Sequence, residues 1–231
     1  QKWTINGVAT NIWTETVAGS YGLPLIAQAA GGTSYAVGYA CVATNGTAAG
    51  TPCSTASVRD QISAFLSAQS FAEKDVVLIQ GGANDILLQA ALLAAGLQTQ
   101  TQMDAALDTT AVAFAGEIKR TVDAGAKQVA VANLPDIGKS IYATHQAQTT
   151  VLSAATRRFN DKVKIELANL GANVLLIDQE LFFNRVMAES NLNRTEAVCT
   201  SPLAKDCTTS TLVPGADPTR YVFADNLHPT P

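Results

Sequence analysis

Three short runs of consecutive apolar residues constrain the fold of this chain most. They cover residues 76–79, 129–132 and 174–177 and consist of Val, Ile, Leu and Ala. A run that is apolar at every position, instead of alternating with polar residues, is typical of a strand buried on both faces of a parallel sheet. A fourth, weaker candidate strand covers residues 34–37.

Helical patterns separate these runs. Apolar residues recur at helical spacing within residues 58–66, 103–118 and 151–167, and Gly125 and Gly171 follow the last two stripes, where helices are expected to end. Strands that alternate with crossover helices predict an α/β fold with a parallel sheet and helices on both faces. We expect one domain over residues 1–231. Within it, residues 181–221 have weak periodicity and predict a loop-rich excursion over the sheet.

Composition narrows the functional classes. Hydrophobic residues make up 47% of the chain and charged residues 15%, which favours a compact globular protein over a disordered one. The net charge of −4, without a Lys/Arg cluster, argues against binding to nucleic acid. No apolar run approaches about 18 residues, so the sequence predicts no membrane-spanning helix.

The four cysteines form two local couples, Cys41 with Cys53 and Cys199 with Cys207, in loops rich in small and polar residues. We interpret them as two disulfides, which predicts a secreted, cell-surface or periplasmic protein; the alternative is four buried thiols in the cytosol. The only histidines are His145, expected at the surface, and His228, and no carboxylate cluster has ligand spacing. The sequence therefore predicts no metal and no cofactor.

Polar residues gather where the strands end, which is where ligands bind in parallel sheets. Asn84 follows the first run, and an amide there can donate a hydrogen bond to a developing oxyanion. The alternative is that it caps a helix. Gly38 follows the weak strand and can present its backbone N–H at close range; the alternative is an ordinary turn glycine.

Asp225 and His228 form the strongest candidate pair. Side chains three positions apart meet on a tight turn, and a carboxylate that orients a histidine makes it a general base. The alternative is a solvated aspartate beside a surface histidine. No obvious nucleophile lies beside the pair in the chain.

The motifs together resemble those of the GDSL or SGNH serine hydrolases, of the larger secreted bacterial type. Gly82-Ala83-Asn84-Asp85 is similar to the family's Gly-x-Asn-Asp block, and Asp225-Asn226-Leu227-His228-Pro229 to its Asp-x-x-His-Pro block. Residues 34–40 are similar to the family's Asn-Tyr-Ala-x-Gly-Gly-Ala block, and residues 133–138 to a segment after a middle strand.

The resemblance implies a three-layer α/β/α sandwich with a flavodoxin-like parallel sheet. It also implies hydrolysis of carboxylic esters through a serine acyl-enzyme. His228 would be general base and then acid, with Asp225 orienting it. The Asn84 side chain and the Gly38 N–H would form the oxyanion hole, and Asp85 would hold the turn.

Two departures from the family are evident. Ser34 and Tyr39 replace the Asn and the second Gly of the second block. The Gly-Asp-Ser block with the nucleophilic serine is absent, and we expect it upstream of Gln1, because residues 3–25 resemble the stretch that follows it. Ser34, Ser57 and Ser140 lack the strand-to-turn setting of a nucleophile.

The absent block includes the first, central strand of the family's sheet, and the family's last helix would follow Pro231. We therefore expect an N-terminal segment of the same polypeptide to complete the sheet. The expected substrate is a small-molecule or lipid ester. The alternatives are an acyltransferase, or a catalytically degenerate SGNH-fold protein that acts as a binding or surface module.

Overall fold

The computed structural model describes residues 11–230, so part of the segment at residues 3–25 lies outside the description. The residues group into two compact units. Among the described residues, unit 1 comprises residues 11–34, 137–149 and 182–230, and unit 2 comprises residues 35–136 and 150–181. The single domain expected over residues 1–231 stays a prediction.

Unit 2 contains the predicted parallel sheet. Strands β1 (Val76–Ile79), β2 (Gln128–Ala132) and β3 (Val174–Ile177) lie in the order β1-β2-β3. Val77 pairs with Val129, and Ala130 pairs with Leu175. The three apolar runs are thus confirmed as strands. The fourth candidate, residues 34–37, is wrong: only Ser34 makes an isolated bridge, to Ala27, and residues 35–37 join no ladder.

Three helices of unit 2 match the three apolar stripes: α2 (Val58–Ala68), α4 (Gln100–Asp123) and α6 (Thr149–Glu166). A further helix, α3 (Ala83–Ala94), was not predicted. Capping boxes begin two of these helices, with Ser57 accepting from the Asp60 N–H and Thr99 from the Gln102 N–H. Gly125 follows α4 with a left-handed φ of 111°, as expected. The expectation for Gly171 is wrong, because α6 ends at Glu166 and the 3₁₀ turn Ala168–Leu170 intervenes.

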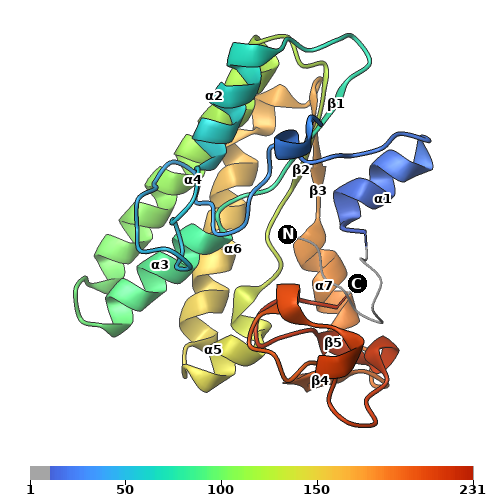
Figure 1. Ribbon diagram of the computed structural model, residues 1–231. Helices are drawn as coiled ribbons and strands as arrows, with labels where there is room; N and C mark the ends of the chain where they lie inside the picture. Colours follow the sequence, from blue (N-terminus) through green and yellow to red (C-terminus); the bar gives the residue numbers. More distant parts are fainter. Residues whose placement is uncertain (1–10, 231) are drawn as a thin grey trace. The chain divides into compact units, whose positions relative to one another are not determined.

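The sheet order determines which face these helices cover. Both crossovers, from β1 to β2 and from β2 to β3, advance in the same direction. Right-handed connections therefore place α4 and α6 on the same face, as Figure 1 shows. Only β2 is buried along almost its whole length, whereas Leu175 on β3 is 66% exposed. The α/β fold class is confirmed, but burial on both faces holds for the central strand alone.

The core of unit 2 lies between sheet and helices. Phe114 on α4 and Phe159 on α6 have ring centroids 6.1 Å apart. These rings also limit the turn after β1, since a Cβ on Gly82 would lie 2.3 Å from the Phe159 ring. The other large side chains that are fully buried in this unit are Ile86, Met103, Leu107, Ile118, Leu152, Val42, Val129 and Val131.

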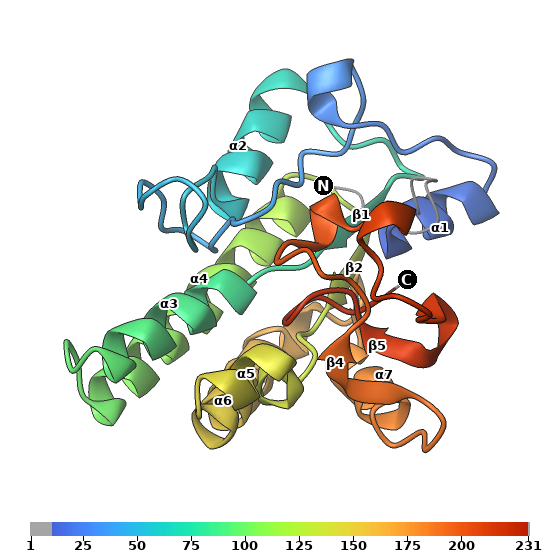
Figure 2. The same ribbon diagram turned by 60° about the horizontal axis from the view of Figure 1, so that its bottom comes forward.

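Unit 1 contains little regular structure. Its helices are α1 (Trp13–Ser20), α5 (Ile141–His145) and most of α7 (Gln179–Val186), and its strands are β4 (Asn193–Ala197) and β5 (Tyr221–Phe223). The two strands are parallel, and Figure 2 shows α7 beside them. Phe183, Val222, Phe223 and Ile141 form the core. Short 3₁₀ turns cover Gln28–Ala30, Ile137–Lys139, Ala204–Asp206, Thr209–Thr211 and Pro218–Arg220.

The excursion expected at residues 181–221 thus includes β4 and most of α7, and its position over the sheet stays a prediction. Among the described residues, no helix is both long and apolar enough to cross a bilayer.

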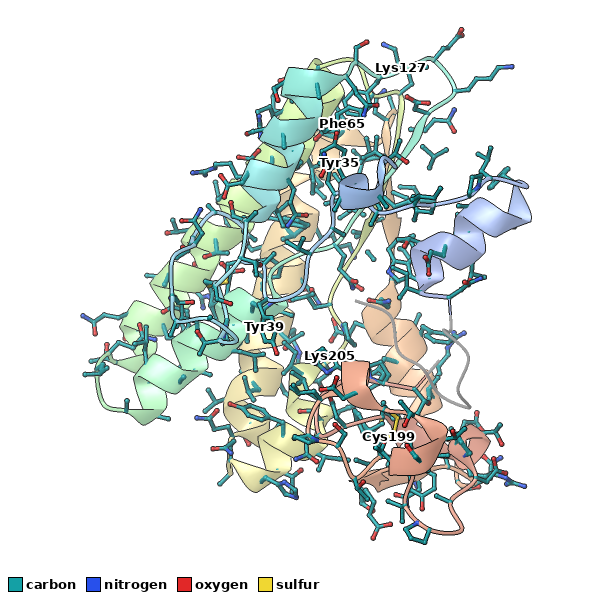
Figure 3. All side chains as sticks on the ribbon, viewed as in Figure 1. Tyr35, Tyr39, Phe65, Lys127, Cys199 and Lys205 are labelled. Carbon is teal, nitrogen blue, oxygen red and sulfur yellow. A yellow bond between two sulfur atoms is a disulfide. The ribbon has the colours of Figure 1, made fainter. Side chains whose placement is uncertain are left out.

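Both predicted disulfides are present. Cys41 bonds Cys53 in unit 2, and Cys199 bonds Cys207 in unit 1, where Figure 3 shows the sulfur atoms beside the Cys199 label. No cysteine is free. The alternative of four buried thiols is therefore wrong.

Candidate active site

The Asp225–His228 pair lies on a tight turn of unit 1. Nδ1 of His228 is 2.8 Å from Oδ2 of Asp225 and 3.1 Å from Oδ1. The turn is closed by a hydrogen bond from the Ala224 N–H to the His228 carbonyl, at 2.8 Å. The contact expected from the spacing of three residues is confirmed.

The carboxylate is buried and the histidine is not. Asp225 is 3% exposed, whereas the His228 side chain is 51% exposed. Oδ1 accepts from the N–H groups of Leu227, at 2.8 Å, and His228, at 2.7 Å, and Oδ2 accepts from the Ala204 N–H, at 2.7 Å. The alternative of a solvated aspartate is therefore wrong.

These hydrogen bonds favour the charged form of the Asp225 carboxylate. Burial alone raises the pKa of Asp225, but the hydrogen bonds from the His228 ring and from backbone N–H groups hold this pKa below its ordinary value. An ionised carboxylate favours the tautomer in which Nδ1 carries the proton, and the other ring nitrogen, Nε2, then has the lone pair. That is the form of histidine that accepts a proton from a nucleophile.

The second group of site residues lies in unit 2, after β1. Gly82, with φ of 109°, is the N-cap residue of α3, so Asn84 and Asp85 fall in the first turn of this helix. The Asn84 Nδ2 group donates to the Ala40 carbonyl, at 2.9 Å. The alternative that Asn84 caps the helix is wrong, because its amide reaches the segment that contains Gly38.

That segment, residues 38–42, is held at five successive carbonyl groups. Asn84 holds the third, and the others accept from residues 53–59. The donors to the carbonyls of Gly38, Tyr39, Cys41 and Val42 are Thr55 Oγ1 and the N–H groups of Cys53, Val58 and Arg59. Within the described part of the chain no hydrogen bond engages the Gly38 N–H. The segment is therefore rigid and leaves this N–H available as a donor.

Tyr39 has an unusual backbone for its residue type. Its φ is 62°, in the left-handed region. The resembling family has glycine at this position, and glycine adopts such a φ without steric strain. In this chain a tyrosine adopts the left-handed conformation at the position where the resembling family has glycine. Figure 3 labels Tyr39 on this segment.

Asp85 connects the same segment to α3. Its Oδ2 accepts from the Val42 N–H, at 3.0 Å, and the residue is 5% exposed. Burial raises the pKa of Asp85 to about 6, and hydrogen bonds from Val42 and its own N–H only partly offset this effect. Its carboxylate lies within 4.8 Å of the sulfur atoms of Cys41 and Cys53, but these are joined in a disulfide and cannot ligate a metal.

The structure thus forms two groups. In unit 1 it brings together Asp225 and His228, and in unit 2 it brings Asn84 and Asp85 to the segment that contains Gly38. His145 is exposed at the end of α5, as expected. Ser57 and Ser140 are the N-cap residues of α2 and α5, a role that explains them without catalysis.

Two supporting contacts were not predicted, the Thr55 hydroxyl on Gly38 and the Ala204 N–H on Asp225. A backbone N–H has no signature in the sequence, so the Ala204 contact requires the structure. Thr55 is one of many threonines in loops, and nothing in the sequence distinguishes it.

Two comparisons with known proteins bear on the family of this chain. A search of curated proteins found no match. A family model described as GDSL-like Lipase/Acylhydrolase matches residues 7–231, nearly the whole chain. The parallel sheet and the helices of this chain are those expected of the α/β sandwich of such hydrolases. The chain therefore belongs to the family of GDSL-like lipases and acylhydrolases, enzymes of the esterase and lipase type.

Proposed function

We propose that this protein is a carboxylic-ester hydrolase that acts through a serine acyl-enzyme. The observation that carries the proposal is the Asp225–His228 contact, in which a buried carboxylate with three backbone N–H donors holds the Nδ1 of a half-exposed imidazole. This arrangement supports His228 as general base and then general acid, and Asp225 as the residue that orients it.

In the proposed reaction, the serine Oγ attacks the ester carbonyl carbon while its proton moves to Nε2 of His228. The tetrahedral intermediate collapses, and His228 returns the proton to the leaving alcohol. Water then attacks the acyl carbon of the acyl-enzyme while His228 takes its proton. His228 returns this proton to the serine Oγ as the acid is released. The nucleophilic serine belongs to the Gly-Asp-Ser block expected upstream of residue 1.

We assign the oxyanion donors to Asn84 and Gly38. The Asn84 amide has two N–H donors, and the hydrogen bond to the Ala40 carbonyl uses one of them. Asp85 supports the same segment through Val42. Two donors of this kind, fixed before the substrate arrives, stabilise a developing oxyanion more than mobile ones do.

The proposed substrate is a small-molecule or lipid ester. The two disulfides support a secreted, cell-surface or periplasmic location in a bacterium, because disulfides persist in oxidising compartments. If an alcohol acceptor intercepts the acyl-enzyme faster than water does, the protein is an acyltransferase. Loss of the serine would make it a binding module.

A fluorophosphonate probe tests the proposal on the protein expressed from its complete gene. We expect covalent labelling and hydrolysis of p-nitrophenyl esters, both lost in His228→Ala. The matched control is His145→Ala, which removes the other histidine of residues 1–231 and is expected to keep both activities. Labelling that persists in His228→Ala, or an unlabelled wild-type protein, contradicts the proposal.

A further inference from the structure

One donor to the buried carboxylate comes from outside its own turn. The N–H groups of Leu227 and His228 belong to the turn and bind Oδ1 of Asp225, whereas the Ala204 N–H binds Oδ2, at 2.7 Å. Oδ2 is also the oxygen nearer to Nδ1 of His228. Ala204 is 2% exposed, so water has little access to replace this hydrogen bond.

The position of Ala204 depends on the disulfide-closed loop of residues 199–207. Ala204 begins the 3₁₀ turn Ala204–Asp206, and its carbonyl accepts from the Cys207 N–H, at 3.1 Å. At the other end of the loop, the Cys199 N–H donates to the carbonyl of Ala224, at 3.1 Å. The loop is therefore attached to the residue directly before Asp225 and closed on itself by the Cys199–Cys207 bond.

The charged residues of the loop pair with each other. Nζ of Lys205, labelled in Figure 3, lies 2.7 and 2.8 Å from the two carboxylate oxygens of Asp206. Both side chains are about half exposed to solvent. In the contacts that the structure shows, the loop thus offers Asp225 a neutral backbone donor, whereas Lys205 pairs with Asp206.

We propose that the loop of residues 199–207 is a positioning element for the Asp225–His228 pair, with Ala204 as the positioning residue. The inference rests on the proposed function. The backbone N–H groups of the turn hold only Oδ1. The Ala204 N–H fixes Oδ2 as well, so the plane of the carboxylate, and with it the orientation of the imidazole, is determined before substrate binds.

Ala204→Pro removes the N–H and tests this directly. Leu203 is extended, with φ −124° and ψ 122°, as the residue before a proline requires, and the first position of a helical turn accepts proline. We expect kcat to fall roughly tenfold to a hundredfold, as for a small misplacement of a catalytic group, with KM little changed. Lys205→Ala, in the same loop, keeps the N–H and is expected to retain the wild-type kcat.

A second measurement does not depend on catalysis. In wild-type protein, NMR is expected to show a downfield Nδ1–H proton of His228, assigned by its loss in His228→Ala and its retention in His145→Gln. This signal should be lost in Asp225→Asn, moved or broadened in Ala204→Pro, and kept in Lys205→Ala. The double variant Cys199→Ala/Cys207→Ala should change the Nδ1–H signal as Ala204→Pro does. It replaces the proline variant in this test if that variant does not fold.

The outcomes separate the two proposals. A folded Ala204→Pro protein with the wild-type kcat and Nδ1–H signal overturns the positioning role, as does an equal effect of Lys205→Ala. A wild-type protein that neither hydrolyses esters nor binds the probe contradicts the proposed function, and the NMR comparison then still decides whether the loop positions the pair.

Discussion

Two left-handed backbone conformations lie beside the candidate oxyanion donors. Gly82, with φ of 109°, begins the helix that carries Asn84, and Tyr39, with φ of 62°, follows Gly38. Glycine adopts such angles freely, whereas a residue with a Cβ loses about 1–2 kcal/mol. The left-handed conformation is therefore unstrained at Gly82 and strained at Tyr39.

Gly82→Ala is expected to be strongly destabilising. The new Cβ meets the Phe159 ring at 2.3 Å and also has an unfavourable φ, so the free energy of unfolding should fall by roughly 2–5 kcal/mol. Gly96→Ala is the control: its φ is 68°, but nothing lies within 4 Å of its added Cβ, so only the strain of about 1 kcal/mol remains. Urea unfolding measures both, and equal losses would contradict the role of Phe159.

Strain at Tyr39 is tested by comparing two substitutions that both remove the ring. Tyr39→Gly should be more stable than Tyr39→Ala by about 1 kcal/mol, because only alanine keeps a Cβ at this φ. At an ordinary helix position the order is reversed. Thermal or urea unfolding of the two variants provides the difference, and an alanine variant as stable as the glycine variant would show that the φ is not left-handed in solution.

For individual residues, the sequence predicts contacts between side chains better than hydrogen bonds from backbone N–H groups. The Asp225–His228 contact follows from a spacing of three residues, and it is present at 2.8 Å. The Ala204 N–H is 21 positions from Asp225 in the chain and its side chain is a methyl group, so no pattern identifies it.

Among the secondary-structure elements, predictability depends on how much apolar surface an element buries. The strands β1, β2 and β3 are continuous apolar runs and were predicted. Strand β4 consists of Asn193–Ala197, with three polar or charged residues after its first Asn, and β5 has only three residues. These two strands pair with each other beside the loop closed by the Cys199–Cys207 disulfide. The disulfide restrains this region, and hydrophobic periodicity does not predict such a restraint.

The segment of residues 38–42 is neither a helix nor a strand, but each of its five carbonyl groups accepts a hydrogen bond. The Cys41–Cys53 disulfide closes a loop with a sequence separation of 12 residues, for which chain entropy predicts a stabilisation of about 3 kcal/mol. Cys41→Ala/Cys53→Ala should therefore unfold at a lower urea concentration. We also expect kcat to fall, since Tyr39 accepts from the Cys53 N–H. An unchanged unfolding midpoint would show that the neighbouring hydrogen bonds suffice.

For the whole molecule, fold class and family were accessible from the sequence, because strand and helix periodicities and the spaced motifs extend along most of the chain. The protonation states of the buried carboxyl groups could not be predicted from the sequence, because they depend on burial and on backbone donors from distant segments. Asp85 and Asp225 are both buried, yet their pKa values move in opposite directions.

These two groups predict how stability depends on pH. The pKa of Asp225 is lowered on folding, so its contribution is complete above about pH 4 and is lost as the pH falls through its folded-state pKa. The pKa of Asp85 is raised from 3.8 to about 6, so its contribution is complete below about pH 4 and is lost as the pH rises through 6. From these two groups, the free energy of unfolding is expected to be highest near pH 4.

Asp85→Asn isolates the second effect. The amide keeps an oxygen for the Val42 N–H but does not ionise, so the decline between pH 4 and pH 7, about 3 kcal/mol for the wild-type protein, should largely disappear. Asp225→Asn should instead flatten the decline below pH 4. Urea unfolding at intervals of half a pH value tests both variants. If Asp85→Asn keeps the wild-type decline above pH 4, then Asp85 is ionised in the folded protein at an ordinary pKa, and water or a cation reaches its carboxylate.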